Sequence, residues 1–282
     1  MVEDMVPASR FPADLTATTG QRTAAGRVLS VLDVFDEDHL ELTLSEIGRR
    51  AGLTLSTTHR LVGELHGWGA LERLPDGRYT VGLRVLELGT LEPQMLQLRD
   101  VAPAYLADLQ SAVDANVHLS VRDGHDVVYL ESLQRRSGAP VLSRLGGRWP
   151  LHATATGMVL LAFAPPGVVD EVLASPLQRF TERTVTDPLV LRRLLAEVRR
   201  TGMSELHEAI TLGAFAVGVP VRGPLDRPMA ALSLTLKQGG PVTAHHVLPA
   251  LHATARALSR AVGSPSEPGP PAASGSHRPR LA

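Results

Sequence analysis

Apolar residues in the N-terminal third of the chain recur at helical spacing in three successive stretches. The first stretch carries them at Ala25, Val28, Leu29, Leu32 and Phe35, which places them on one face of a helix. Two further helices follow, separated by a short turn that contains a glycine. Two helices joined in this way form a helix-turn-helix. The pattern therefore predicts a three-helix unit of this type.

The ends of the second and third helices are marked by residues that favour caps. Thr43, or alternatively Ser45, can begin the second helix, and Gly52 can end it. A hydroxyl accepts from the free amides of a first turn, and glycine readily adopts the left-handed conformation after a last turn. Ser56 can cap the third helix in the same way. The buried side of that helix is then formed by Leu61, Val62 and Leu65.

A β-hairpin is predicted directly after the third helix. Leu71, Tyr79 and Val81 flank the dipeptide Asp76-Gly77, and Asp-Gly between apolar residues is a strong hairpin signal. A hairpin in this position forms the wing of a winged helix-turn-helix. Beyond it, apolar residues return to helical spacing over 83–98 but are interrupted by a glycine and a proline. This stretch predicts a kinked helical connector.

The C-terminal half mixes the two periodicities. Helical spacing or continuous apolar character predicts helices over 101–112, 154–163, 189–200 and 243–262. Short apolar runs beside turn residues predict strands over 118–121, 127–130, 215–221 and 229–236. Hairpins interspersed with helices favour an antiparallel sheet covered by helices. The predicted fold class is therefore α+β.

The two ends of the chain lack periodicity. The last twenty residues are rich in Pro, Gly and Ser and cannot bury a core. The first twenty residues mix Pro, Thr, Ala and acids, with no positive region before an apolar stretch, which argues against a signal peptide. The predicted order is a disordered tail (1–20), a winged helix-turn-helix (21–82), a linker helix (83–100), a second domain (101–262) and a disordered tail (263–282).

Composition excludes several kinds of site. The chain has no cysteine, which removes disulfides, thiolate nucleophiles and cysteine-based zinc sites and fits a cytoplasmic protein. The net charge is −1, so any nucleic-acid contact must come from a local patch. The apolar run at 158–163 is far too short to cross a bilayer. We expect no metal, no cofactor and no membrane association.

Several motifs, in order and at matching spacing, resemble the IclR family of bacterial regulators. The resemblance extends over about residues 24–240. It is carried by the motifs LTLSEIGRRAGL at 42–53, STTHRL at 56–61, YTVGLRVLELG at 79–89, Asp123-Gly124, Val128-Tyr129-Leu130 and PLHATATG at 150–157. The resemblance implies a winged helix-turn-helix followed by a GAF-like effector domain. It also implies dimers or tetramers that bind double-stranded operator DNA and respond to a small molecule, often an organic or aromatic acid.

The candidate DNA-binding residues lie on the third helix and the wing. Hydroxyls near a helix N-terminus suit phosphate contacts, and an arginine can fork onto guanine or hold a phosphate. Thr58 is left out because the family has a small buried residue there. Leu55 replaces a basic residue that many members carry. The candidates are Ser56, Thr57, His59 and Arg60 on the helix, with Arg73 and Arg78 on the wing; the alternative is that they are ordinary solvent-facing residues.

The resemblance also implies an effector pocket lined by Ala155, Thr156, Leu206, Ala216, Ser233 and Thr235. The sequence departs from the family pattern in having Leu206 where Asp is common, Ala216 where Cys is common, and Ala209 where a glutamate is expected. Phe215 adds an aromatic ring. A pocket with fewer charged groups offers a small carboxylate little to replace its water. We therefore expect an effector larger or more apolar than a two- or three-carbon acid, or else loss of effector response.

Two other classes of function compete with this interpretation. The eleven histidines suggest a metal or acid–base site, but His207-Glu208 has Thr211 where a zinc-protease motif needs its second histidine. His152 lies on a turn where a structural hydrogen bond is expected, and His118 lies on a strand in the core or at its rim. The second alternative is an interaction module whose winged helix binds protein and whose second domain only dimerises. An enzyme is not expected.

Overall fold

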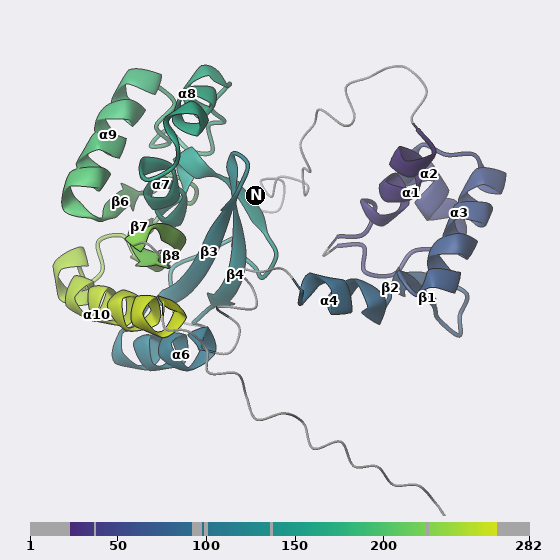
Figure 1. The fold of residues 1–282 in the computed structure, drawn as a ribbon, viewed down its shortest axis with the longest axis horizontal. Coiled ribbons are helices and arrows are strands. Elements are labelled where there is room, and N and C mark those ends of the chain that lie inside the picture. The colour runs from purple at the N-terminus through teal and green to yellow at the C-terminus, as the bar shows by residue number, and fades with distance from the viewer. Residues whose placement is uncertain are drawn as a thin grey trace, which may run out of the picture.

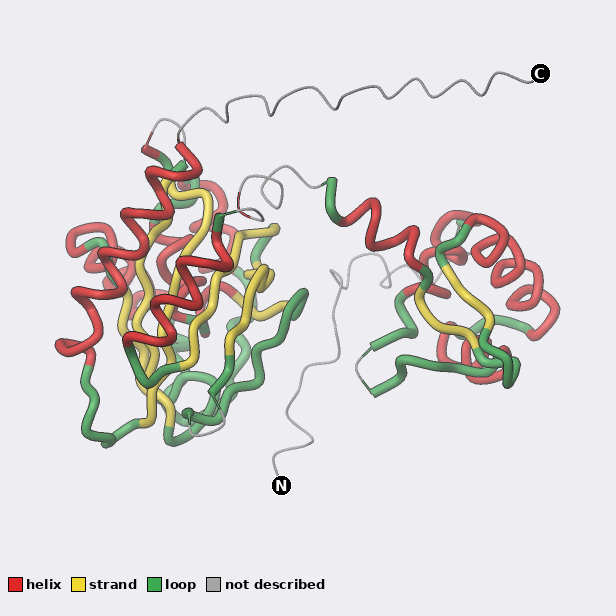
Figure 2. Tube along the Cα trace, turned by 90° about the horizontal axis from the view of Figure 1, so that it is seen from below, coloured by secondary structure: helices red, strands yellow, loops and turns green. Residues whose placement is uncertain are grey.

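The computed structural model forms two bodies, an N-terminal and a C-terminal unit (Figures 1 and 2). The structure describes residues 23–36, 38–91, 98, 101–135, 138–223 and 226–263. The expected tails at 1–20 and beyond Gly263 therefore lie outside the described residues, as does most of the connector after Leu91.

Three helices build the N-terminal unit: α1 (Ala24–Leu32), α2 (Leu44–Ala51) and α3 (Leu55–Trp68). Their apolar faces meet in one core, as the helical spacing predicts. The first helix is shorter than expected, because Phe35 lies beyond the C-terminal end of α1 and packs against the core from the following turn. The core is made by Val31, Val34, Leu42, Ile47, Ala51, Leu61, Val62, Leu65, Ala70 and Leu71.

The helix caps confirm one prediction and correct another. Thr43 caps α2 in a capping box, since its hydroxyl accepts from the Glu46 amide while Glu46 accepts from the Thr43 amide. Gly52 ends α2 in the left-handed conformation, with φ 65°. The prediction of Ser56 as the cap of α3 is wrong: Thr54 caps that helix. Ser56 instead lies in the first turn of α3.

The wing is the hairpin of β1 (Leu71–Arg73) and β2 (Tyr79–Val81), which pair antiparallel. The chain then enters α4 (Leu83–Gly89) directly. Gly82 separates the two elements, and a Cβ there would lie 2.2 Å from the carbonyl oxygen of Gly69. Only glycine therefore allows the wing to return so close to the end of α3.

A six-stranded antiparallel sheet forms the centre of the C-terminal unit, in the order β5-β4-β3-β8-β7-β6. The strands expected from the sequence correspond to β3, β4, β7 and β8. The sequence did not indicate β5 or β6, which have three and four residues and show too little alternation to be recognised. The strands are β3 (Asn116–Asp123), β4 (Asp126–Leu133), β5 (Arg148–Pro150), β6 (Ser204–His207), β7 (Ala214–Arg222) and β8 (Pro228–Lys237).

Helices cover both faces of this sheet (Figure 1). One face carries α6 (Ala102–Ala112) and α10 (Ala244–Gly263), and the other carries α7 (Ala155–Ala162), α8 (Pro166–Ala174) and α9 (Pro188–Thr201). The apolar pattern did not predict α8. Pro166 is in fact the first residue of α8, a position that suits the fixed φ of proline.

The two faces of the sheet differ in polarity. Val117, Leu119 and Val121 of β3 enter the apolar core shared with α6 and α10. Because side chains alternate along a strand, Asn116, His118 and Ser120 point to the opposite face, toward α7, and they are buried too. The fold therefore places a row of polar groups inside the C-terminal unit.

Candidate DNA-binding and ligand-binding sites

The four predicted residues of α3 lie along the side of the helix that faces away from the core. Ser56, His59 and Arg60 are exposed, and Thr57 is half-buried beside the Thr54 hydroxyl, 3.0 Å from it. Thr58 is fully buried and donates a hydrogen bond to the Thr54 carbonyl at 2.9 Å. Thr58 is therefore buried, whereas Ser56, Thr57, His59 and Arg60 form a row of accessible polar side chains on α3, the α3 row.

Arg60 is held by its own helix. Its Nη1 lies 2.6 Å from Glu64 Oε1, and both side chains are more than half exposed, at 59% and 58%. An exposed ion pair of this kind adds little to stability. The guanidinium can therefore leave Glu64 for another anion at small cost.

The wing presents two arginines in different surroundings. Arg78 lies between Asp76 and Glu41, with N–O distances of 2.6 and 2.7 Å, and its hydrogen bond to Asp76 raises the pKa of the guanidinium further. The guanidinium of Arg73 lies over the ring of Tyr79, 5.9 Å from its centre. Because β1 packs against α3, the wing arginines belong to the same body as the α3 row.

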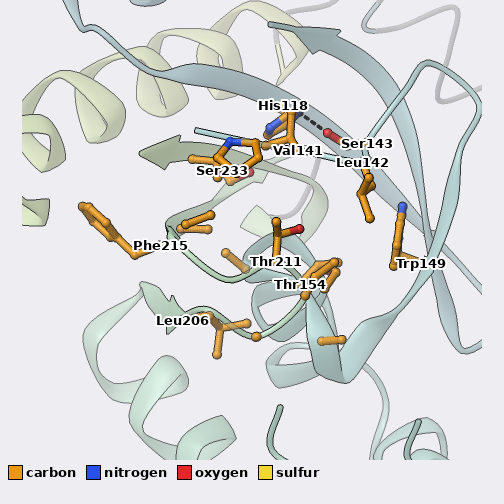
Figure 3. Close-up of a pocket in the computed structure, with 18 of the residues that line it drawn as sticks. His118, Val141, Leu142, Ser143, Trp149, Thr154, Leu206, Thr211, Phe215 and Ser233 are labelled. Atoms are coloured by element: carbon orange, nitrogen blue, oxygen red, sulfur yellow. Dashed lines mark hydrogen bonds between the residues drawn. The ribbon is translucent and has the colours of Figure 1, made fainter. Parts of the chain in front are cut away.

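The C-terminal unit contains a cavity between the polar face of the sheet, the N-terminus of α7 and two irregular segments (Figure 3). Its empty volume is about 550 Å³, which includes the space at its open mouth. The irregular segments contribute residues 140–143, after β4, and residues 209–211, after β6.

The inner end of the cavity is formed by His118 and Ser233, which are directly paired across β3 and β8 (Figure 3). His118 Nδ1 lies 3.2 Å from the hydroxyls of both Ser132 and Ser143. The Ser143 carbonyl accepts from Ser132 and from Gln134. These bonds fix the imidazole ring and tie the segment 140–143 to the sheet.

Burial controls the protonation of this end of the cavity. Removal from water lowers the pKa of His118 to about 4, so the ring is neutral near pH 7. Burial likewise raises the pKa of Tyr129 to about 12, and its ring meets His118 edge-on at 5.5 Å. His118 Nε2 is buried and has no hydrogen-bond partner among the described residues. Such a group is costly unless a ligand or water satisfies it.

The opposite end of the cavity is held by hydrogen bonds to the backbone. Thr154 caps α7 by accepting from the Gly157 amide at 2.9 Å. Thr184 donates to the Ala209 carbonyl at 2.6 Å, and Thr181 donates to the Glu208 carbonyl at 2.6 Å. These contacts shape the segment that follows β6, although that segment has no regular structure.

Five of the six predicted pocket residues line this one cavity: Ala155, Leu206, Ala216, Ser233 and Thr235. The sixth, Thr156, is fully buried in α7 and is not among the lining residues. His152 makes the expected structural hydrogen bond, from Nε2 to the Gln178 carbonyl at 2.9 Å.

Sequence reasoning missed much of the cavity wall. The lining residues that it did not name for the pocket are His118, Tyr129, Pro140, Val141, Leu142, Ser143, Trp149, Ala153, Thr154, Ile210, Thr211 and Ala214. Ala209 and Phe215 were named only as departures from the family pattern. One signal was available, because His118 alternates with the apolar residues Val117, Leu119 and Val121 along one strand. The irregular segments carry no such periodic signal.

None of the helices in the described part of the chain is long and apolar enough to cross a membrane. Within the same residues, no group of three or more His, Asp or Glu side chains is placed to hold a metal ion.

Two family models match the chain. One describes the IclR helix-turn-helix domain and matches residues 24–75. The other describes the C-terminal domain of the bacterial transcriptional regulator IclR and matches residues 93–260. The second match alone spans more than half of the chain.

Similar proteins cover nearly the same length. The HTH-type transcriptional regulator XynR of Escherichia coli is 32% identical over 85% of this chain and 97% of its own. The crystal structure of an IclR homolog from Microbacterium hydrocarbonoxydans complexed with 4-hydroxybenzoate is 37% identical, with a TM-score of 0.79 over 84% of this chain and 97% of that one. Thermotoga maritima IclR is 27% identical, with a TM-score of 0.70 over 86% and 100%.

Proposed function

The chain belongs to the IclR family of bacterial transcriptional regulators. We propose that its N-terminal unit binds operator DNA and that its C-terminal unit binds an effector that controls this binding. The family assignment makes it a regulator and not an enzyme. It acts in the cytoplasm as a dimer or tetramer that binds operator DNA and an effector. We place the boundaries of the DNA-binding domain, linker and effector domain at 21–82, 83–100 and 101–262.

The DNA-binding surface consists of the α3 row and the wing. The observation that carries this proposal is the exposed polar row on the second helix of the motif, beside a wing that bears two arginines. N-terminal residues of a recognition helix reach base edges in the major groove. The contacting residues are Ser56, Thr57, His59 and Arg60 on α3, with Arg73 and Arg78 on the wing.

The effector occupies the cavity lined by Ala155, Leu206, Ala216, Ser233 and Thr235. Thr156 supports α7 behind the lining. The similar protein from Microbacterium hydrocarbonoxydans is complexed with 4-hydroxybenzoate, which makes a small aromatic acid the first candidate for this cavity. An aromatic or otherwise ring-containing effector also agrees with the apolar side chains of the wall.

Dimers or tetramers assemble through α4 in this proposal. Its apolar side chains are left in solvent: Leu83 is 72% exposed, Leu86 64% and Leu88 46%. A helix with apolar residues on several sides needs a partner to cover them. Effector binding then shifts the population of linker arrangements and changes the spacing of two winged helices on the operator.

The direct test is a fluorescence anisotropy titration of the full chain against its own upstream DNA at two salt concentrations. We expect specific binding that weakens steeply with salt, because phosphate contacts release counterions. Addition of 4-hydroxybenzoate is expected to change the operator affinity. If neither upstream DNA nor DNA selected from a random pool binds, the interaction-module alternative replaces DNA binding.

A further inference from the structure

The inner end of the cavity holds a buried polar atom without a partner. His118 is 2% exposed, and its Nδ1 is turned toward Ser132 and Ser143. Its Nε2 lies on the other edge of the ring, and the side chain lines the cavity beside Ser233. Folding alone gives this nitrogen no hydrogen bond within the described residues. A ligand in the cavity is in position to supply one.

The surroundings decide what kind of ligand atom suits that position. No Asp, Glu, Lys or Arg is among the described residues that line the cavity. A carboxylate driven to the inner end would lose its water and meet no cation, which is costly. A hydroxyl can donate or accept one hydrogen bond. It therefore satisfies Nε2 in either tautomer, since the hydroxyls of Ser132 and Ser143 can pair with Nδ1 in either role.

The walls between the two ends are mainly apolar. Figure 3 places Phe215 on one side of the cavity and Leu142 and Trp149 on the other, with His118 at one end and Thr154 and Leu206 at the opposite end. Flat apolar walls bury a ring well, whereas a short acid leaves them uncovered.

We propose that the cavity selects a ring compound that carries an uncharged hydroxyl, such as a phenol, and that this hydroxyl binds His118 Nε2. The inference rests on the proposed effector function of the cavity and specifies its ligand class. Any charged group of the ligand then points away from His118, toward the end of the cavity formed by Thr154 and Leu206. His118 acts here as a specificity-determining residue, because it distinguishes a hydroxylated ring from the same ring without the hydroxyl.

The test compares two ligands of nearly equal size, 4-methylphenol and toluene, by calorimetric titration of the full chain without DNA. We expect 4-methylphenol to bind about five- to tenfold more tightly, which is the effect of one buried hydrogen bond. In His118→Phe the ratio is expected to fall to about one, because toluene keeps its apolar contacts. Ser120→Ala is the matched control: Ser120 is also buried and unpartnered among the described residues, on the same face of β3, but it does not line the cavity.

A measurement on the wild-type chain avoids dependence on the folding of the variant. The side-chain nitrogen resonances of histidine report hydrogen bonding at Nε2, and 4-methylphenol should shift those of His118 whereas toluene should not. Equal affinity for the two ligands, no binding of either, or a preference that survives in His118→Phe would each overturn the proposal. Operator binding is measured without these ligands, so its failure would count against the proposed function and remain distinguishable.

Discussion

The two units place their functional polar groups in opposite environments. The α3 row and the wing carry theirs in solvent, where Arg60 is 59% exposed and paired with Glu64. The cavity carries its polar groups inside the protein, where His118 and Ser233 are 2% and 3% exposed. The proposed DNA-binding surface therefore relies on charged side chains in solvent, whereas the cavity relies on buried hydroxyls and a neutral imidazole.

Function and stability are coupled at the cavity but largely independent on the exposed side of α3. An exposed side chain can be replaced with little effect on folding, so changes on α3 should alter DNA affinity alone. A buried polar group is part of the core, so changes at the cavity should alter folding and ligand binding together. The chain has two tryptophans, Trp68 in α3 and Trp149 in β5. Each unit can therefore be followed by its own fluorescence.

The largest expected effect comes from the helix that supports the cavity. A Cβ at Gly157 would lie 2.3 Å from the Leu151 carbonyl oxygen and 2.5 Å from Thr154 Oγ1. Gly157→Ala should therefore destabilise the C-terminal unit by about 3 kcal/mol or more, through overpacking against backbone and loss of the cap. The measurement is urea unfolding followed by Trp149 fluorescence in a Trp68→Phe background.

The matched control for this substitution is Gly167→Ala in α8. A Cβ at Gly167 meets no atom within 4 Å, so alanine should be neutral or stabilise the helix by up to about 1 kcal/mol. Similar free energies of unfolding for the two alanine variants would show that the close approach at Gly157 is not real.

The second prediction is that the stability of the C-terminal unit depends on pH through His118. The pKa of His118 is about 4 in the folded chain, against 6.5 for a free histidine. Below pH 6.5 His118 takes up a proton in the unfolded state but stays neutral in the folded state. Its contribution to the free energy of unfolding is therefore fully present above pH 6.5 and is lost as the pH drops toward 4. At about 1.4 kcal/mol per pKa unit, the loss is about 3 kcal/mol over this range. Urea unfolding of the C-terminal unit at several pH values measures it.

Other buried groups of the C-terminal unit change the slope of its free energy of unfolding against pH. Burial lowers the pKa of His152 and His252, which steepens the loss, and raises the pKa of Asp126 and Glu131, which opposes it at the acidic end. His118→Phe isolates the contribution of one residue, and its pH profile should be flatter than that of the wild type. Parallel profiles would mean that folding does not change the pKa of His118.

The N-terminal unit could be predicted in detail because its signals are local. Residues close in sequence determine the Thr43 N-cap and the Gly52 C-cap of α2, and both caps are found in the structure. The errors concern the end of α1, which stops before Phe35, and the start of α3, where Thr54 and Ser56 each carry a hydroxyl that can accept from the first turn. Sequence alone does not choose between two such caps; the length of the turn after Gly52 does.

The cavity could be predicted only in part because its walls come together through tertiary contacts. Five lining residues were inferred from family resemblance, including Ser233 at the inner end, but His118 beside it was not. Ser143 and Trp149 follow β4 in irregular chain and a three-residue strand, and hydrogen bonds to distant residues hold them. The alternation around His118 marked a buried polar position, yet only the packed sheet shows that it opens into a cavity.

A third prediction addresses the exposed region directly. Arg60→Ala should weaken operator binding by about 1–3 kcal/mol, through loss of a base or phosphate contact, while unfolding of the N-terminal unit changes little. Anisotropy at fixed salt measures the affinity, and Trp68 fluorescence follows the unfolding. Arg192→Ala is the control, because Arg192 is 58% exposed and paired with Asp170 on the C-terminal unit. Equal affinities of the two variants would remove Arg60 from the DNA surface.

The smallest expected effect concerns the partner of Arg60. Glu64 lies on α3 within 2.6 Å of the guanidinium, where its charge competes with phosphate for the arginine and repels the DNA backbone. Glu64→Gln should therefore strengthen operator binding, by less than about 1 kcal/mol, since the exposed pair is weak. Glu197→Gln, which removes the carboxylate partner of Arg200 on the other unit, should leave the affinity unchanged. Weaker binding by Glu64→Gln would instead mean that Glu64 orients Arg60 for the groove, and the arginine would then act from a fixed position on the helix.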